Sequence, residues 1–488
     1  MNLPPASSEA APSLARVIPR DSHPISRSRI SPDALRVLYR LREAGFQAFL
    51  VGGCVRDLML GLEPKDFDVA TDALPEEVKR LFRNCRLVGR RFRLAHVFFG
   101  REIIEVATFR ASGAPPQGEE PIEVDSPEGE AYESEEPLDD SRDVHDFDES
   151  LERVVDHSGR ILRDNIYGSI DDDVWRRDFT CNALYYNIAD FSVWDYCSGF
   201  EDVTARRLRL IGDPETRYRE DPVRMLRAAR FEAKLGFTLE PATAEPIPAL
   251  RELLAGVPAA RLFDETLKLF LTGHGARSFE VLHERGLLGA LLPSVADFAT
   301  RFPNSAPIRM LKKGLSNTDE RVRRDQPVTP SFLFALLLYG PIGLEIERAP
   351  RERWNDLGTI LDAVERAVRS VLERVAIHRR FTLGMRDMFA LQPRLESPRG
   401  RRALRTLEHP RFRAAFDLLQ LRAEFGMADP ALVEWWARLQ GSSPEQRNAM
   451  SEAAGGGERS GGAGSRRRRS RRGGRRRGGQ EQGDRGAG

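Results

Sequence analysis

Cysteine is scarce in this sequence, and its spacing excludes the usual metal-binding arrangements of that residue. The 488 residues include four cysteines, and no two of them show a paired metal-ligand spacing. Scattered single cysteines are typical of free thiols in a reducing compartment, so disulfide bonds are not expected. The four are Cys54, Cys85, Cys181 and Cys197.

The sequence also lacks a long uninterrupted hydrophobic run near its start. This region contains Pro4, Pro5 and Pro12 and has no apolar core of the kind found in a signal peptide or a membrane span. A chain of this length can bury large cores and divide into two or more domains. We therefore expect a multidomain protein of the cytoplasm with no membrane-spanning segment.

A net charge of +1 leaves no overall excess of either sign, yet the two signs are segregated. Residues 117–150 contain 15 acidic residues and one Arg, whereas residues 451–488 contain 11 Arg and four acidic residues. Neither segment can bury enough apolar surface to fold, so both are predicted to be disordered. The C-terminal segment also lacks aromatic side chains, and arginines such as Arg466 and Arg467 predict an electrostatic arm for nucleic acid.

The most informative stretch begins with an apolar run followed by two glycines. Residues 48–51 are AFLV, and residues 52–57 are GGCVRD, before an apolar segment that ends at Gly61. This pattern predicts a strand, a glycine turn and the start of a helix. Glycine lets backbone N–H groups approach an anion closely, and a helix N-terminus adds partial positive charge. Gly53 is therefore a candidate phosphate-binding residue.

Two aspartates follow this turn. Asp66 and Asp68 flank Phe67, and alternate side chains of a strand share a face, so both carboxylates are expected on one side of a strand. Adjacent carboxylates repel unless a cation lies between them, and oxygen ligands suit Mg²⁺. Glu105, in the apolar run 103–109, would be costly to bury unless it served the same cation. The simpler alternative is a turn or a solvated edge.

These residues resemble a known family. The GGCVRD segment, followed by the pair Asp66 and Asp68, is similar to the head of the class II nucleotidyltransferases, which include bacterial poly(A) polymerases and CCA-adding enzymes. The resemblance implies an α+β fold, in which a polymerase-β-like head with a mixed sheet precedes an all-α neck and body. It also implies that Gly53 and Arg56 hold the nucleotide.

The segment RRDFT at residues 176–180 is a signature of the same family. From the residues alone, an exposed salt bridge explains Arg177 and Asp178 as well as a role in the active site does. The resemblance implies instead that Arg177 contacts the nucleotide and that Asp178 belongs to the active site. Either Glu105 or Asp178 would complete the acidic set, and the sequence leaves this choice open. Residues 195–202 resemble the flexible segment that follows this motif in the family.

A second helix start lies further along the chain. Pro222 predicts the first turn, with Asp221 as its cap, and arginines spaced three apart follow on one side. The residues alone favour a solvated basic stripe, although phosphate or a base edge would relieve the repulsion between these arginines. The resemblance makes Asp221 and Arg224 the nucleobase-reading pair, and it places Arg227 and Arg230 on phosphates or adjacent RNA.

The remaining helical pattern is rich in arginine, which suits a sequence-independent grip on an RNA backbone. Residues 408–419 resemble bacterial poly(A) polymerases in particular. The sequence shows no His-Asp metal pair of the phosphohydrolase type, which some CCA-adding relatives append. The cluster RRFR at residues 90–93 is either a solvated edge or a contact for phosphate or RNA. The candidate RNA-binding residues of this region are Arg379, Arg380, Arg401 and Arg402.

The change from mixed to purely helical periodicity near residue 212 divides the chain, and no strand is expected beyond it. In the family, a helix similar to residues 260–270 braces the neck, and Arg261, Glu265 and Lys268 share one of its faces. The predicted parts are a disordered leader (1–20), the head (21–211, with a disordered acidic insertion at 117–150), the neck (212–275), the RNA-binding body (276–440) and a disordered tail (441–488).

The resemblance implies transfer of AMP from ATP to the 3′ hydroxyl of RNA, with Mg²⁺ held by Asp66 and Asp68. The first hypothesis is a poly(A) polymerase that tails transcripts and promotes their decay, with RNA-decay proteins as partners. The second is a CCA-adding enzyme, which uses CTP and ATP on tRNA. The third is an inactive RNA-binding scaffold, which the intact acidic residues disfavour.

Overall fold

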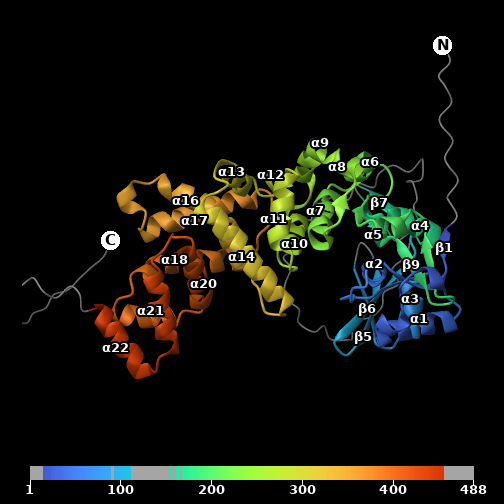
Figure 1. Cartoon of the computed structure of the whole chain (residues 1–488), viewed down its shortest axis with the longest axis horizontal. Helices are drawn as coiled ribbons and strands as arrows, with labels where there is room; N and C mark the ends of the chain where they lie inside the picture. Colours follow the sequence, from blue (N-terminus) through green and yellow to red (C-terminus); the bar gives the residue numbers. More distant parts are fainter. Residues whose placement is uncertain (1–14, 90–92, 112–152, 156–160, 165–166, 456–488) are drawn as a thin grey trace, which may run out of the picture.

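The computed structural model describes residues 15–89, 93–111, 153–155, 161–164 and 167–455. This part of the chain is elongated, with a sheet-containing head at one end and helices over the rest (Figure 1). The head (21–211), the neck (212–275) and the body (276–440) have the predicted boundaries given above, which remain predictions. The acidic insertion, most of the RRFR cluster and the arginines of the tail beyond Arg447, including Arg466 and Arg467, lie outside the described residues.

The head is built on a mixed sheet, as predicted. In spatial order its strands are β1 (Arg16–Ile18), β10 (Val193–Asp195), β9 (Leu184–Asn187), β2 (Ala48–Val51), β3 (Asp68–Thr71), β6 (Glu102–Thr108), β5 (Leu94–Phe99) and β4 (Cys85–Val88). Neighbouring strands are antiparallel except β3 and β6, which are parallel. A parallel pair needs a crossover, which α3 (Pro75–Leu81) provides together with β4 and β5.

Three helices cover one face of this sheet: α1 (Pro32–Glu43), α2 (Gly53–Met59) and α3. The predicted start of α1 is confirmed, because the Ser31 hydroxyl accepts hydrogen bonds from the N–H groups of the second and third helical residues. A smaller apolar cluster that includes Phe49 and Tyr185 covers the other face, together with α4 (Ile170–Arg176).

Two predictions about the head are wrong in detail. The predicted leader is too long, because Arg16–Ile18 forms β1 and pairs with β10. Asp66 was expected on the same strand as Asp68, but β3 begins at Asp68. The side chains still alternate, since Phe67 is buried between an exposed Asp66 and a partly exposed Asp68.

A two-stranded parallel ribbon joins the head to the helices that follow it. β11 (Arg207–Leu208) pairs with β12 (Thr238–Leu239), and α7 (Val223–Leu235) lies between them in the sequence. The prediction that no strand follows residue 212 is therefore wrong at β12. Two residues are too few to produce a recognisable period in a hydrophobic pattern.

The neck and body are helical, as predicted. α7 packs against α10 and α11, and α22 packs against α19 and α21. The tail was predicted to be disordered from residue 441, and this is wrong for α22.

Two small strands, β7 (Arg153–Val155) and β8 (Ile161–Asp164), form a separate hairpin. The other helices are α5 (Gly199–Thr204), α6 (Pro214–Glu220), α8 (Pro241–Ala244), α9 (Ile247–Leu250), α10 (Ala259–Phe270), α11 (Gly275–Glu284), α12 (Leu287–Leu291), α13 (Pro293–Arg301), α14 (Ala306–Arg323), α15 (Pro330–Leu337), α16 (Tyr339–Glu347), α17 (Leu357–Leu372), α18 (Arg379–Glu396), α19 (Gly400–Leu407), α20 (Phe412–Glu424), α21 (Pro430–Gly441) and α22 (Pro444–Gly455).

Within the described ranges, no single helix has the length and apolar character needed to cross a membrane. Only the pair α15 and α16 meets those two criteria, when its helices are taken together across a bend of 51°.

Candidate active site

The predicted glycine turn lies against the acidic strand. Gly52 has a φ of 78°, which side chains rarely adopt, and a Cβ there would lie 3.7 Å from Asp68 Oδ2 and 4.0 Å from Arg177 Nη1. The backbone conformation therefore favours glycine, and the Asp68 carboxylate and the Arg177 guanidinium lie at van der Waals distance from the position of the missing side chain. α2 begins at the next residue, Gly53, so a helix N-terminus is part of the same corner.

Three carboxylates form what we call the acidic set: Asp66, Asp68 and Glu105. The parallel register of β3 and β6 places Asp68 directly opposite Glu105. Burial, followed by the charge of Glu105, raises the pKa of Asp68 to about 6, and Asp66 adds to the rise against the opposing effect of Arg177. On the other side of Glu105, His96 Nε2 lies 3.5 Å from its Oε2 atom. The raised pKa indicates that the positive charge of Arg177 does not offset burial and the neighbouring carboxylates.

The donor types in this acidic set fit Mg²⁺. Within the described ranges, no group of three or more His, Cys, Asp or Glu side chains is arranged so that it could hold a metal ion. Mg²⁺ does not need such a group, because it is commonly bound by one or two carboxylates together with substrate phosphates. The unneutralised Asp68 and its neighbours match that requirement, and Asp66 and Asp68 remain the predicted ligands.

Arg177 is held in place beside the glycine turn. Its Nη2 donates to Asp173 Oδ2 at 2.9 Å, and its Nε donates to the Tyr185 hydroxyl at 2.7 Å. Tyr185 in turn donates to Asp173 Oδ2 at 2.7 Å. Sequence reasoning named Arg177 but missed both partners. The spacing of four residues between Asp173 and Arg177 on a helix was the available signal.

Arg56 does not face an open site in this structure. Its side chain is 2% exposed, and it donates to Asp57 Oδ1 at 2.7 and 2.9 Å and to Asn182 Oδ1 at 2.5 Å. The guanidinium also lies over the Phe231 ring of α7. Arg56 thus donates three of its five N–H groups within the head and contacts the neck through Phe231, and its contact with a nucleotide remains a prediction.

The carboxylate of Asp178 is paired with arginines of α7. Arg224 Nε donates to Asp178 Oδ1 at 2.9 Å, and Arg227 Nε lies 2.5 Å from its Oδ2. Burial alone would raise the pKa of Asp178, but the charges of Arg227 and Arg224 outweigh it and lower the pKa. Of the two acids left open by the sequence, Glu105 lies opposite Asp68 in the sheet, whereas Asp178 is paired with arginines. Which of them completes the catalytic set remains a prediction.

The predicted base-reading pair lies at the start of α7. Asp221 Oδ1 accepts from the Val223 N–H at 3.2 Å, which agrees with its predicted capping position. Its other oxygen accepts from Arg261 at 2.6 Å, so α10 does brace this turn. Arg224 also donates to Glu220 Oε2 at 2.9 Å. Asp221 and Arg224 are thus each fixed by other residues.

Arg230 was expected on a phosphate or RNA but faces a carboxylate. Its Nε lies 3.6 Å from Glu265 Oε2, and neither of these buried atoms has a hydrogen-bond partner in the described structure. Glu265 also pairs with Lys268 at 3.1 Å. The arginine stripe that the sequence predicted is therefore largely neutralised by protein carboxylates, Asp178 and Glu265.

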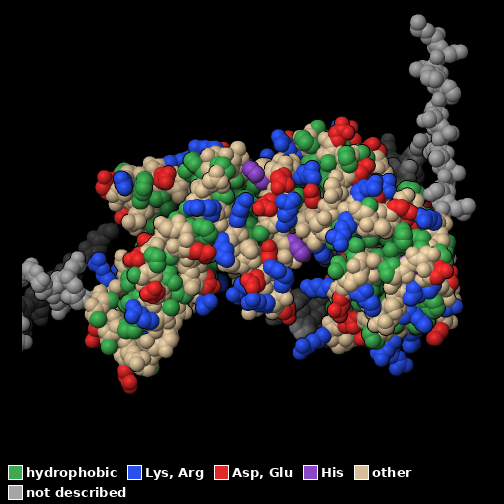
Figure 2. Space-filling view, viewed as in Figure 1, with side chains coloured by type: hydrophobic (Ala, Val, Ile, Leu, Met, Phe, Trp, Pro, Cys, Tyr) green, Lys and Arg blue, Asp and Glu red, His purple; other side chains and the backbone are tan. Residues whose placement is uncertain are grey.

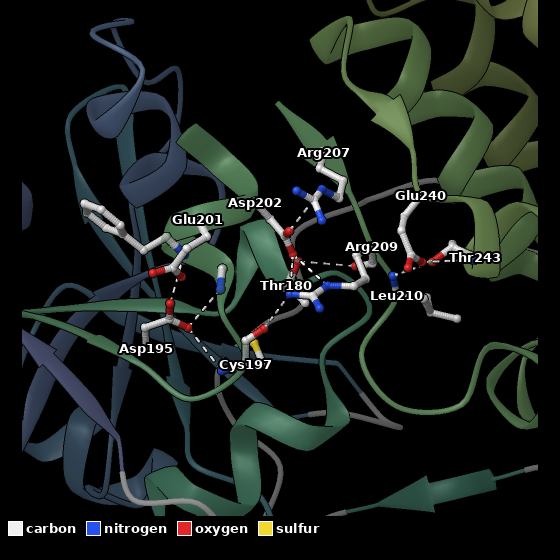
Figure 3. Close-up of polar contacts among 12 residues, drawn as sticks. Thr180, Asp195, Cys197, Glu201, Asp202, Arg207, Arg209, Leu210, Glu240 and Thr243 are labelled. Carbon is white, nitrogen blue, oxygen red and sulfur yellow. Dashed lines mark hydrogen bonds and ion pairs between the residues drawn. The ribbon is translucent and has the colours of Figure 1, made fainter. Parts of the chain in front are cut away.

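The segment predicted to be flexible is instead tightly bonded (Figure 3). Asp195 accepts from the N–H groups of Cys197, Gly199 and Phe200 at 2.9 to 3.1 Å. Asp202, which is 1% exposed, has three partners. Its partners are the Thr180 hydroxyl at 2.6 Å, Arg209 at 2.8 Å and Arg207 at 3.6 Å.

The candidate RNA-binding arginines of the body lie at two helix starts. Arg379 and Arg380 begin α18, and Arg401 and Arg402 lie in the first turn of α19. All four are exposed. Their role in RNA binding remains a prediction.

Three protein families match successive parts of the chain. Residues 48–209 match "Poly A polymerase head domain", residues 236–298 match "Probable RNA and SrmB-binding site of polymerase A", and residues 353–476 match "Polymerase A arginine-rich C-terminus". The first range contains the glycine turn and the whole acidic set.

Whole-length relatives are also similar. Poly(A) polymerase I of Salmonella typhi is 47% identical over 453 residues, which cover 91% of this chain and 90% of that protein. Poly(A) polymerase I of Haemophilus influenzae is 44% identical over 87% of this chain and 88% of its own length. A CCA-adding enzyme of Lactobacillus helveticus is 33% identical over 54% of this chain and 55% of its own length.

Solved structures agree on the fold. A tRNA nucleotidyltransferase complexed with a primer tRNA and an incoming ATP analog has a TM-score of 0.51 at 20% identity, covering 83% of this chain and 98% of its own. The fold and the acidic corner thus define a nucleotidyltransferase with a polymerase-β-like head. The long, closely similar relatives then narrow the class: the chain belongs to the bacterial poly(A) polymerase family.

Proposed function

We propose that this protein adds AMP from ATP to the 3′ ends of RNA without a template. The observation that carries the proposal is the acidic set beside the glycine turn, in a chain 47% identical to a poly(A) polymerase over 91% of its length. CCA-adding enzymes are more distant relatives, since the similarity covers about half of the chain. Tailing of transcripts in the cytoplasm, followed by decay with the help of RNA-decay proteins, is the biological role we infer.

In this proposal, Asp66, Asp68 and Glu105 hold divalent cations at the corner. Bound Mg²⁺ would lower the pKa of the attacking RNA hydroxyl and stabilise the leaving pyrophosphate. The chain itself supplies the other elements. Gly52 leaves room for phosphate beside Asp68, and Arg177, fixed by Asp173 and Tyr185, offers positive charge at the same place.

The base is read at the start of α7 in the same proposal. Asp221 offers a carboxylate acceptor, and Arg224 offers donors once its bonds to Asp178 and Glu220 rearrange. In this proposal, Asp178 holds the Arg224 side chain until the nucleotide binds. Its part is therefore to position Arg224 and not to complete the acidic set.

A single extension assay tests the proposal. Purified protein with Mg²⁺ would receive either an unstructured RNA primer or a tRNA lacking its CCA end, each with ATP or CTP. Long tails on the primer with ATP alone are the expected result. Addition confined to CCA on the tRNA would overturn it in favour of a CCA-adding enzyme. No extension of either RNA would favour an inactive scaffold.

A further inference from the structure

One side of α7 carries three basic side chains, of which two are neutralised. Arg227, Arg230 and Lys234 follow one another at spacings of three and four residues, which bring them to the same side of a helix. Arg227 pairs with Asp178, and Arg230 faces Glu265. For Lys234, no carboxylate lies within salt-bridge distance in the described ranges, and the side chain is exposed. It is therefore the cation of this side that remains available to a ligand.

Lys234 lies where the neck meets the head. Arg56 of α2 lies over the ring of Phe231, with its Cζ 6.0 Å from the ring centroid, and Phe231 is one turn before Lys234. Desolvation, followed by the charge of Arg56, lowers the pKa of Lys234. The carboxylates Asp57 and Asp66 act in the opposite direction. Lys234 is thus within electrostatic reach of Asp66, a member of the acidic set.

Arg323 is a further cation on the side of Lys234 that faces the body, and His274 lies beside it. α11 packs against α7, and His274 directly precedes α11. Desolvation lowers the pKa of His274, and the nearby charges of Lys234 and Arg323 lower it further, against Asp319. Arg323, at the end of α14, donates to the Asp319 carbonyl at 3.2 Å. Figure 2 shows Lys and Arg side chains gathered over this middle part of the molecule, around α10 and α14.

We propose that Lys234 binds a backbone phosphate of the RNA strand near its 3′ end, and that Arg323 continues this path toward the body. The proposal rests on the proposed function, because it names where the strand enters that site. A lysine ammonium is a flexible point charge, which suits phosphate recognition without regard to sequence.

A strand fits this position better than the incoming nucleotide does. Lys234 lies ten residues beyond Arg224, or about 15 Å along the helix axis. The basic groups beyond it lead away from the base-reading turn and toward α14. A nucleotide ends at its triphosphate, whereas a strand can contact Lys234 and Arg323 together.

The test is the Lys234→Gln variant of the full chain, compared with Lys234→Arg and with Lys79→Gln. Lys79 is an exposed lysine of α3, which covers the sheet face opposite to the acidic set. We expect Lys234→Gln to raise the KM for an oligoadenylate primer about fivefold, with kcat and the KM for ATP within about twofold. The salt dependence of primer binding in a gel shift should fall by about one unit of slope. Lys234→Arg should restore both values, and Lys79→Gln should change neither.

Two results would overturn the proposal. An unchanged primer KM and salt slope would show that Lys234 does not contact RNA. A rise in the KM for ATP with an unchanged primer KM would place the lysine on the triphosphate instead. The gel shift needs no catalysis, so it separates this proposal from the proposed function: a wild-type protein that fails to extend RNA still reports whether Lys234 contributes to the slope.

Discussion

The acidic set and the arginine-bound aspartates of the head differ in the charges that surround their carboxylates. Asp68 faces other carboxylates, and its pKa is raised to about 6. Asp178 and Asp202 are each held by two arginines, and the pKa of Asp178 is lowered. A carboxylate with its own cations stabilises the fold, whereas one without them costs stability until a ligand supplies the charge. We propose that this difference separates an aspartate that stabilises the fold from one that binds a cation for the reaction.

The strongest way to test this comparison is to remove the Asp68 charge. Asp68→Asn should lower primer extension on the order of a thousandfold, because cation binding at the acidic set is lost. RNA binding in a gel shift should persist. Asp297→Asn, which alters an exposed pair with Arg301, is the matched control and should keep full activity. Extension retained by Asp68→Asn would remove this residue from the catalytic set.

The same substitution at a neutralised aspartate should act on the fold. Asp202→Asn leaves Arg207 and Arg209 without their buried partner, so the free energy of unfolding should fall by about 3 kcal/mol. Denaturant titration would measure the change. A stability equal to that of the wild type would mean that this cluster contributes little, and the comparison with Asp68 would fail.

The pH dependence of stability should distinguish the two kinds of aspartate. Below about pH 3, Asp68 is protonated in both the folded and unfolded states, so wild type and Asp68→Asn should be equally stable. Its folded pKa of about 6 lies above the ordinary pKa of an aspartate, so ionisation penalises the folded state as the pH rises. Above pH 6, without divalent metal, the variant should be more stable by about 2 to 3 kcal/mol. A gap that does not change between pH 4 and pH 7 would contradict the raised pKa.

The smallest effect is expected from the arginine-rich tail, which the sequence presents as positive charge with few acidic partners. Truncation after Gly464 should weaken RNA affinity modestly and flatten its salt dependence, while kcat at saturating RNA stays unchanged. Gel shifts at several salt concentrations would measure this. If the slope is the same with and without the tail, the arm does not lie on the RNA.

Local features of the fold were predictable from the sequence, and long-range pairings were not. Ser31 and Pro32 predicted the start of α1, and the double glycine predicted the turn beside Asp68, because these signals act within a few residues. The choice between Glu105 and Asp178 depended on the register of β3 against β6, which no local pattern encodes.

The same limit explains the arginines of α7. Their spacing was visible in the sequence, but the carboxylate that neutralises Arg224 lies 46 residues earlier in the chain. Repulsion along the helix therefore suggested a phosphate ligand where the fold supplies Asp178. Arg56 was likewise assigned to nucleotide because its burial under Phe231 depends on packing between the head and the neck.

The short ribbon of β11 and β12 fixes the position of the end of α7. The N–H groups of Thr238 and Glu240 donate to the carbonyls of Arg206 and Leu208 at 2.9 Å, immediately after α7 ends. Tilting α7 away from the sheet would break both bonds. In the proposed function, main-chain bonds thus hold the distance between the base-reading turn and the acidic set, and we expect nucleotides to be selected by their length as well as by their base edge.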